Sequence, residues 1–347
     1  MKKADIVWKS SGCAIQGRSH IDKGIPCQDK IGMRSSNGTY VICLSDGAGS
    51  ARLSHFGAEC VVEYGINLFA SSFDDVFRMD DGDKAKTVIL EAIIDGIKEK
   101  SKELSCDLKD LAATLLVVAV QEDKYIIVHI GDGVIGYFEN GEIKVASAPS
   151  NGEFSNETFF VTSSDAASYM KVFKGSIKNI EGFVIMSDGT EQSLYNKNNK
   201  SLGKAVIKLL KHNVMLNETA MEEQLQQTFQ NLIVPKTHDD CSIVLLSRGS
   251  KHIHSIEEMT YQEKCEVYKI NLNDKCVKRR VRRYDALVMT IDKPERFESI
   301  SQKIHLKPKY TRKQLNYLCE LGLFKCKNGL YCSNICNKSG ICPTEIL

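Results

Sequence analysis

Two runs of apolar, strand-forming residues in this chain end in nearly the same way, on an aspartate followed by glycine. Residues 41–50 read VICLSDGAGS and residues 183–190 read FVIMSDGT, so Asp46 and Asp188 each follow a hydrophobic run. A carboxylate at the end of a buried strand is costly unless a cation lies near it, and a following glycine lets backbone carbonyls approach that cation. We therefore expect two strand ends that are distant in sequence to meet at one cation site.

The first 250 residues carry the pattern of antiparallel sheets. The turn ENGE at 139–142 contains Asn-Gly, a strong signal for a tight hairpin. Helical spacing appears in pairs of segments, at 56–68 and 89–97 and again at 203–212 and 219–232, rather than once after every strand. This order favours an α+β fold, with two antiparallel β-sheets in a sandwich flanked by α-helix pairs, over a doubly wound parallel sheet. The expected strands are 39–44, 113–120, 125–130, 134–138, 142–146, 158–162, 183–187 and 242–247.

Charge is distributed unevenly along the 347 residues. Residues 251–347 hold 19 Lys and Arg against 11 Asp and Glu, a net charge of +8, which leaves 27 against 33, a net charge of −6, for residues 1–250. The segment SRGSKHIHS at 247–255 is polar and contains glycine, as a linker does. We expect two domains with different partners, 1–250 and 251–347, the second small, basic and mostly helical.

Apolar and cysteine patterns bear on where the protein works. The longest apolar stretch, LAATLLVVAV at 111–120, is ten residues long, roughly half of what a membrane helix needs, and the first residues lack the apolar core of a secretion signal. Most of the 13 cysteines stand singly inside apolar segments, which is typical of reduced, buried thiols. The expected location is the cytoplasm, without membrane contact.

Further acidic residues share the setting of the first two. Asp29 stands in GIPCQDKIG, Asp132 lies in HIGDGVIG between two expected strands, and Asp239 and Asp240 directly precede the strand SIVLLS. Asp-Gly is also a common turn dipeptide, so any one of these sites alone is more readily a loop than a ligand. Together they are the oxygen ligands that Mg²⁺ and Mn²⁺ require, and no comparable His/Cys set accompanies them, which disfavours catalytic zinc.

The motifs, taken in order, resemble those of the metal-dependent serine/threonine protein phosphatases of type 2C. The resemblance spans about residues 8–247, and each motif is weak alone. The matching stretches are GIPCQDK (24–30), LSDGAGSA (44–51), AATLLVVAV (112–120), HIGDG (129–133), MSDGT (186–190) and HDDCSIVLL (238–246).

This resemblance implies a site for two Mg²⁺ or Mn²⁺ ions at one end of the sandwich. Asp46 would bridge both ions, the Gly47 carbonyl would bind one, and Asp188 and Asp239 would hold the other. Asp29 would act nearby through water, and Asp132 would help to hold a third, weaker ion. Asp239 is aligned with the ligand, and its neighbour Asp240 is the alternative. The implied reaction is hydrolysis of phosphoserine or phosphothreonine on proteins, by a water that the two ions activate.

Three positions depart from the family pattern. An arginine usually lies shortly before the first acid and binds the substrate phosphate; here His20 falls three residues after Gly17, and Arg18 lies two residues earlier. Either side chain could bind phosphate, with His20 preferred and Arg18 in reserve. Gly133 replaces a common serine, and Gln28 stands where an acid is usual. These departures resemble a divergent bacterial-type branch of the family.

The basic carboxy-terminal part resembles a winged helix. Helical patterns over 284–291, 297–306 and 310–324 are followed by KCKNGLYCS, a short hairpin. Basic residues at 278–283 and at the start of the third helix suggest nucleic acid, but protein interaction or autoregulation is slightly favoured. The thiols of Cys326, Cys332, Cys336 and Cys342 could bind structural zinc, although their spacing is not the tight zinc knuckle and free thiols are the preferred reading.

The sequence thus predicts a cytoplasmic protein phosphatase that acts on a phosphoprotein and opposes a serine/threonine kinase. The alternative is a non-catalytic, phosphatase-like scaffold whose basic domain binds DNA or a protein partner. Retention of the core aspartates speaks against that alternative.

Overall fold

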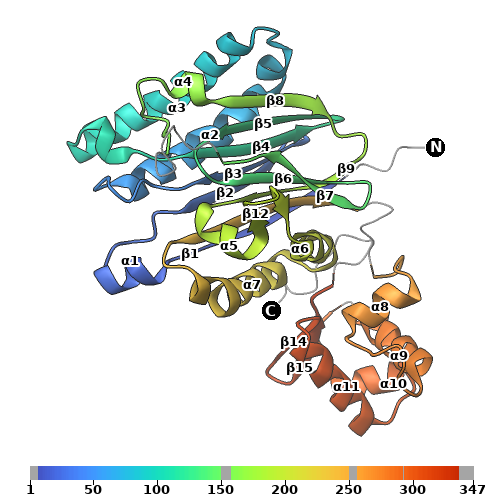
Figure 1. Ribbon diagram of the computed structural model, residues 1–347. Coiled ribbons are helices and arrows are strands. Elements are labelled where there is room, and N and C mark those ends of the chain that lie inside the picture. Colours follow the sequence, from blue (N-terminus) through green and yellow to red (C-terminus); the bar gives the residue numbers. More distant parts are fainter. Residues whose placement is uncertain (1–6, 150–157, 250–255, 292, 336–347) are drawn as a thin grey trace. The chain divides into compact units, whose positions relative to one another are not determined.

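The computed structural model describes residues 7–149, 158–249, 256–291 and 293–335 (Figure 1). Residue contacts divide the chain into two compact units, Met1–Leu210 with Leu225–Arg248, and Lys211–Gln224 with Gly249–Leu347. This division differs from the expected domains 1–250 and 251–347 in one segment, because Leu216 pairs with Ile335 in a β-bridge. The assignment of two functional domains stays a prediction.

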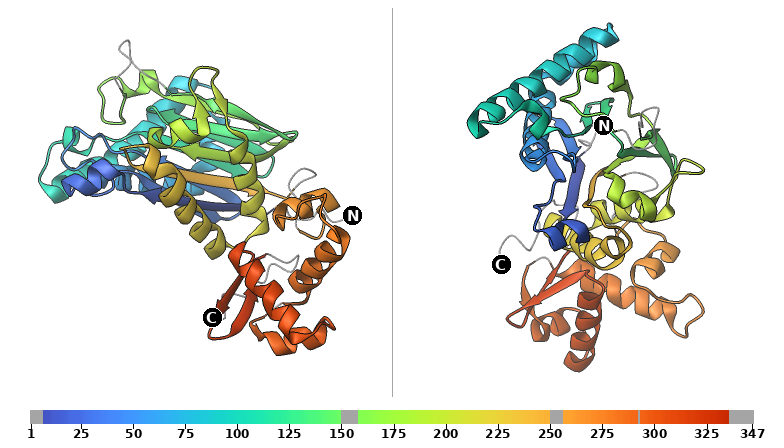
Figure 2. Two further views of the ribbon diagram at one scale, coloured as in Figure 1. Left: turned by 60° about the horizontal axis from the view of Figure 1, so that its bottom comes forward. Right: turned by 60° about the vertical axis from the view of Figure 1, so that its left-hand side comes forward.

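Two antiparallel five-stranded sheets form the first unit (Figures 1 and 2). Every neighbouring pair of strands in both sheets runs antiparallel, which confirms the expected α+β sandwich. The strands of one sheet, in spatial order, are β2 (Lys30–Ser36), β3 (Thr39–Ser45), β4 (Leu115–Gln121), β5 (Lys124–Ile130) and β8 (Lys171–Ser176). Those of the other are β1 (Trp8–Ile15), β12 (Cys241–Arg248), β9 (Ile180–Met186), β6 (Val134–Glu139) and β7 (Glu142–Ser147).

Alternation along the buried strands builds two apolar layers. On β3, Ile42 and Leu44 pack in the layer between the sheets, whereas Val41 and Cys43 pack under the helices. Successive strand side chains point to opposite faces, so a strand buried on both faces reads as a continuous apolar run. The long helices α2 (Ser54–Arg78) and α3 (Gly82–Leu104) cover that outer face and supply residues such as Phe69 to its core.

The opposite outer face is covered by α5 (Glu191–Leu194) and by the first turns of α6 (Lys204–Met215) (Figure 1). A Cβ on Gly182 of β9 would lie 3.1 Å from a methyl carbon of Leu210, so glycine lets this helix approach the sheet closely. α7 (Glu218–Thr228) continues into a π-helical turn at Phe229–Ile233. Short helices at Arg18–Lys23 (α1), Leu108–Leu111 and Ala166–Tyr169 (α4) complete this part of the chain.

One expected strand was wrong, and three strands of the two large sheets were not expected. Residues 158–162 form a single bridge and then a turn, because Phe159 stacks on Tyr169 and Val161 donates its N–H to Ala113, outside any ladder. β1, β2 and β8 contain serine, glycine or lysine and lack continuous apolar runs. Pairing with an apolar neighbour, rather than intrinsic propensity, makes them strands.

The second unit contains α8 (Tyr261–Val267), α9 (Val277–Thr290), α10 (Phe297–Lys303) and α11 (Pro308–Glu320). Its small sheet has the order β13 (Glu295–Arg296), β15 (Leu330–Ser333), β14 (Phe324–Lys327). Asn328 and Gly329, with φ of 54° and 78°, form the hairpin turn between β14 and β15. From α9 onward the elements run helix, strand, helix, helix, hairpin, and the winged-helix resemblance of this unit stays a prediction.

Cysteines and apolar helices carry no further motif in the described residues. No disulfide joins two of the described cysteines, and Cys326 and Cys332 join no cluster of metal-ligand type among the described residues; Cys336 and Cys342 lie outside those residues. Within the same residues, the search for a helix both long and apolar enough to span a membrane finds none.

Candidate active site

The strand pairing brings the acidic motifs to one end of the sandwich. In one sheet, the start of β2 pairs with the end of β3 (Lys30 with Ser45), and the start of β4 pairs with the end of β5 (Leu115 with Ile130). In the other, Met186 at the end of β9 lies opposite the first residues of β6 and β12. Aspartates just before β2 and β12 and just after β3, β5 and β9 therefore all lie at the same end.

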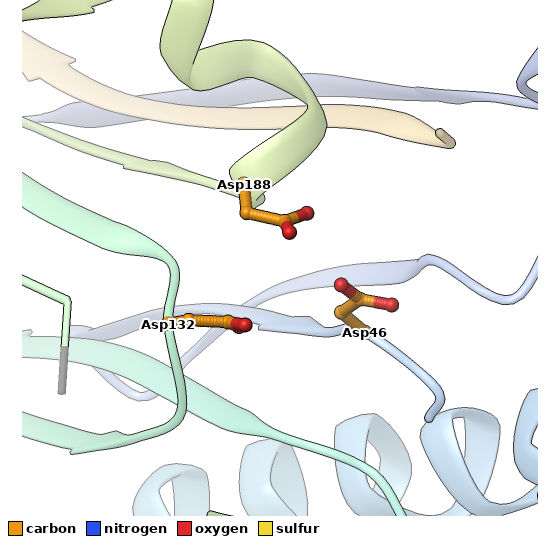
Figure 3. Close-up of side chains that lie close together, drawn as sticks. All are labelled: Asp46, Asp132 and Asp188. Carbon is orange, nitrogen blue, oxygen red and sulfur yellow. The ribbon is translucent and has the colours of Figure 1, made fainter. Parts of the chain in front are cut away.

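Three of these carboxylates form one cluster. Asp46, Asp132 and Asp188 each offer a carboxylate oxygen, and the three oxygens lie within 4.8 Å of one another. Figure 3 shows the three side chains, from strand ends in both sheets, extending into a common space. Burial, followed by the charges of Asp29 and Asp188, raises the pKa of Asp46 well above its ordinary value. Several acidic groups thus lie close together at this point.

Thr114 fixes the backbone at Asp46. The Asp46 N–H donates to the Thr114 hydroxyl at 2.8 Å, and the Thr114 N–H donates back to the Asp46 carbonyl at 2.8 Å. The next residue, Gly47, has no room for a side chain, since a Cβ would lie 2.8 Å from the Ser54 carbonyl carbon. The threonine of the AATLL motif is therefore the residue that orients the aspartate at the end of β3.

The Asp188 loop is held against the start of β12. The Ser242 N–H donates to the Ser187 hydroxyl at 3.0 Å, and the Ser187 N–H donates to the Ser242 carbonyl at 3.1 Å. A Cβ on Gly189 would lie only 1.9 Å from the Asp240 carbonyl oxygen, so this position requires glycine. The Asp-Gly pair here reflects a close approach of two backbones rather than a free turn.

Asp132 is oriented by a residue that the sequence analysis did not single out. The Thr158 hydroxyl donates to an Asp132 carboxylate oxygen at 2.6 Å. The following glycine, Gly133, fits against β9 and β4, because a Cβ would lie 2.7 Å from the Met186 carbonyl oxygen and 2.8 Å from a methyl carbon of Leu116. The departure from the family's serine is therefore matched by its surroundings.

Asp29 is deeply buried, at 2% exposure. Burial, to which the charge of Asp240 adds, raises its pKa to about 7. Neither of its carboxylate oxygens accepts a hydrogen bond of ordinary geometry among the described groups, although the Ser187 and Ser242 hydroxyls lie close enough to offset part of this rise in pKa. A buried carboxylate with no donor is costly unless water or a cation satisfies it.

The two adjacent aspartates before β12 have different surroundings. Asp240 is 2% exposed, and its two oxygens accept from the Gly17 N–H and the Gln28 N–H, each at 2.6 Å. Asp239 is exposed, accepts from the Asp240 N–H at 2.9 Å, and contributes to the electrostatic field at Asp46. Asp240 therefore acts as a clamp on the amino-terminal segment, while Asp239 lies near the cluster but outside its tight group of three.

His20 and Arg18, the expected phosphate-binding residues, lie on α1 beside this clamp. His20 is 13% exposed and places Nδ1 2.9 Å from an Asp240 oxygen, close enough for an ion pair when the ring is protonated. Arg18 is exposed, and its Nε–H donates to the Thr237 carbonyl at 3.0 Å, which leaves its terminal amines for other partners.

The donor set fits hard divalent cations. Carboxylates that share one Mg²⁺ or Mn²⁺ ion place their oxygens at most about 4.2 Å apart, given ligand distances of about 2.1 Å, and the observed cluster needs little adjustment to reach that. Burial and neighbouring carboxylates raise the pKa of both Asp29 and Asp46, so a bound cation would stabilise their charged forms. Cys27 and Cys241 lie close by, but burial raises the pKa of both thiols, which disfavours thiolate ligands.

Residues 16–230 match the family model described as protein phosphatase 2C. The chain belongs to this family. It is 25% identical over 171 residues to Serine/threonine-protein phosphatase 3 of Escherichia coli (strain K12), a match that covers 48% of this chain and 67% of that relative. The expected enzyme class, a protein serine/threonine phosphatase, is thereby confirmed.

Solved structures agree on the fold. A bacterial serine phosphatase matches with a TM-score of 0.50 at 13% identity, covering 71% of this chain and 99% of that one. A point mutant of a bacterial serine phosphatase gives a TM-score of 0.51 at 13% identity, with the same coverage. A sex determining protein of C. elegans matches with a TM-score of 0.50 at 12% identity, covering 71% of this chain and 66% of that one. At these identities the likeness concerns the fold alone.

Proposed function

We propose that this member of the protein phosphatase 2C family hydrolyses phosphoserine and phosphothreonine on proteins in a reaction that depends on Mg²⁺ or Mn²⁺. The observation that carries the proposal is the convergence of Asp46, Asp132 and Asp188, from strand ends of both sheets, within 4.8 Å. Like charges this close disfavour one another, so a fold that assembles them is best explained by a cationic occupant.

Each acid has a role in this proposal. Asp46 stands between the others and would contact two ions, together with the Gly47 carbonyl. Asp188 and Asp239 would hold one of the two, Asp132 would add a third, weaker site, and Asp29 would act through water. When bound, two such cations lower the pKa of a water molecule and offset charge on the phosphoryl oxygens.

Other residues keep these acids in place. Thr114 and Thr158 orient Asp46 and Asp132 through the hydrogen bonds described above. Asp240 ties the segment of Gly17 to the site, so we assign it a positioning role and leave Asp239 as the ligand of the pair.

The substrate phosphate requires a cationic side chain at the edge of the site. Arg18 retains its terminal amines, and the ring of His20 is held beside Asp240, so both remain candidates on α1. Alanine at a phosphate-binding residue should raise KM for a phosphopeptide more than it lowers kcat, because binding in the ground state is lost. Measuring KM and kcat for Arg18→Ala and for His20→Ala therefore shows which of the two residues binds the substrate phosphate.

The test of the proposal is hydrolysis of a phosphothreonine peptide by the full chain, with Mn²⁺ and with excess EDTA. We expect activity only with Mn²⁺, and a loss of at least about 100-fold in Asp46→Asn and Asp188→Asn. Asp95→Asn, on the exposed surface of α3, is the matched control and should retain full activity. Equal turnover in all variants, or full activity in EDTA, would reject the proposal and favour the non-catalytic scaffold.

The cellular setting follows from the proposed reaction. A phosphoprotein phosphatase requires a serine/threonine kinase that phosphorylates the same substrate, so we propose such a kinase as its functional opposite. The cytoplasm remains the proposed location.

A further inference from the structure

The exposed surface of α11 is strongly basic. No Asp or Glu occurs between residues 299 and 319, a segment that contains Lys303, Lys307, Lys309, Arg312 and Lys313. The amphipathic helix Pro308–Glu320 buries Thr311, Leu315 and Leu318 and leaves its cations in solvent. The basic face of α11, defined by Lys307, Lys309, Arg312 and Lys313, thus belongs to one helix and the turn before it.

The described residues supply no carboxylate to these cations, although the Arg312 guanidinium lies over the Phe297 ring, 5.3 Å from its centroid. Lys303 is paired with Glu295, but no ion pair involves Lys307, Lys309, Arg312 or Lys313 in the part of the chain that the structure describes. Elsewhere on this unit basic residues do find acids, for example Arg280 with Asp274 and Lys325 with Glu223. Lys278, Arg279 and Arg282 on α9 are also exposed and form no ion pair in the part of the chain that the structure describes, so α11 is one of two helices of this unit with unpaired basic charge.

The same face begins at an open helix end. Lys307 is the amino-terminal cap of α11 without a side-chain hydrogen bond, Pro308 is the first helical residue, and the first turn holds no acid. The partial positive charge of the helix start adds to that of the side chains. Tyr310, in this first turn, is 58% exposed and places an aromatic ring among the cations.

α11 is the third helix in the order helix, strand, helix, helix, hairpin that begins at α9. α10 and α11 lie next to each other, and the Tyr317 and Tyr331 side chains hold α11 through hydrogen bonds to the Tyr268 carbonyl and to Asn316. Its apolar side is thereby fixed to the unit, and its basic side is exposed. In helix-turn-helix folds, the residues at the start of this helix contact base edges in the major groove.

We propose that the basic face of α11 binds duplex DNA, with Lys307, Lys309, Arg312 and Lys313 on phosphate oxygens and the first turns of the helix in the major groove. A helix fits the major groove of B-DNA, whereas the major groove of duplex RNA is too deep and narrow to admit it. The wing contributes less, because Lys325 at its base is engaged with Glu223. The phosphatase unit carries net negative charge and is not expected to contribute.

The test is fluorescence anisotropy of a labelled 25-bp DNA duplex with the full chain over a series of NaCl concentrations. We expect binding that weakens steeply with salt, since each phosphate contact contributes about 0.9 to the slope of log K against log salt. The triple variant Lys309→Ala, Arg312→Ala, Lys313→Ala should reduce that slope by up to about 2.7, and each lost contact should weaken binding roughly eightfold at 0.1 M salt.

Two further variants serve as controls. Lys84→Ala, Lys98→Ala, Lys102→Ala removes the same charge from exposed positions on α3 and should leave binding unchanged. The charge-conserving variant Lys309→Arg, Arg312→Lys, Lys313→Arg should retain binding. Hydrolysis of a small phosphate ester should be unaffected by every one of these changes, which separates this proposal from the phosphatase proposal.

Several outcomes would overturn the proposal. It fails if the duplex does not bind at 0.05 M NaCl, or if the α11 triple variant loses no more affinity than the α3 control. It also fails if duplex RNA of the same length, or an acidic phosphopeptide, binds more tightly than the DNA.

Discussion

Asp240 is predicted to be essential for the stability of the phosphatase unit, while its neighbour Asp239 is not. Asp240 is buried and accepts two backbone N–H groups, of Gly17 and Gln28, at 2.6 Å each. Alanine at this position leaves both donors buried without a partner, at about 1–3 kcal/mol each. We therefore expect Asp240→Ala to lower the free energy of unfolding by about 3–5 kcal/mol.

The matched control is Asp239→Asn. Asp239 is exposed, and an asparagine carbonyl can still accept from the Asp240 N–H, so we expect a loss below about 1 kcal/mol. The loss of stability in Asp240→Asn should lie between those of Asp240→Ala and Asp239→Asn. Its amide oxygen can still accept one hydrogen bond, but its amide NH₂ faces the second backbone donor.

The single tryptophan makes the measurement specific to this unit. Trp8 is 4% exposed in the layer between the two sheets, so its fluorescence reports unfolding of the sandwich and not of the second unit. Urea unfolding at pH 7 in EDTA removes any contribution from bound metal. The proposed role of Asp240 would be refuted if the free energy of unfolding of Asp240→Ala lay within about 1 kcal/mol of the parent value, or if Asp239→Asn lost as much stability as Asp240→Ala.

Two other predictions use the same fluorescence assay. Gly133→Ser restores the hydroxyl usual in the family, but its Cβ would lie 2.7 Å from the Met186 carbonyl oxygen. We therefore expect this variant to lower the free energy of unfolding by about 1–3 kcal/mol, whereas Gly82→Ser, in open space, should lower it by less than about 1 kcal/mol. Equal losses in the two variants would contradict this prediction. Burial lowers the pKa of His129 to about 3, so the stability that its neutral form confers is present above the unfolded value of about 6.5 and declines as the pH falls towards 3. Between pH 7 and pH 5 the parent should lose about 2 kcal/mol of its free energy of unfolding through His129, a loss that His129→Gln should not show. The prediction is contradicted if His129→Gln loses as much stability between these pH values as the parent, or if His238→Gln, at an exposed position, has the same effect as His129→Gln.

Much of the fold could be predicted because its central strands are buried on both faces. β3, β4, β9 and β12 read as apolar runs, and the Asn-Gly turn gave the direction of β6 and β7. Edge strands β1, β2 and β8 carry polar residues, since one side of each lacks a neighbouring strand, and they could not be found from propensity. The strand predicted at 158–162 was wrong because apolar side chains can also hold a turn in place.

Part of the candidate site could be predicted from the sequence. Strand-end aspartates could be found, since strand direction determines which ends meet, but the distances between them could not. The different surroundings of Asp239 and Asp240 depend on the backbone N–H groups of Gly17 and Gln28, more than 200 residues earlier. Thr158, which orients Asp132, gave no signal, because its role depends on a contact across 26 residues.

The most direct test of the central claim is a calorimetric titration of Mn²⁺ into the metal-free full chain at pH 7.5. The clustered carboxylates predict two bound ions per chain in the parent, and the loss of at least one ion, or a decrease of about 100-fold in affinity, in Asp46→Asn. Binding of Mn²⁺ to Asp46→Asn with the stoichiometry and affinity of the parent would show that Asp46, Asp132 and Asp188 do not form the metal site.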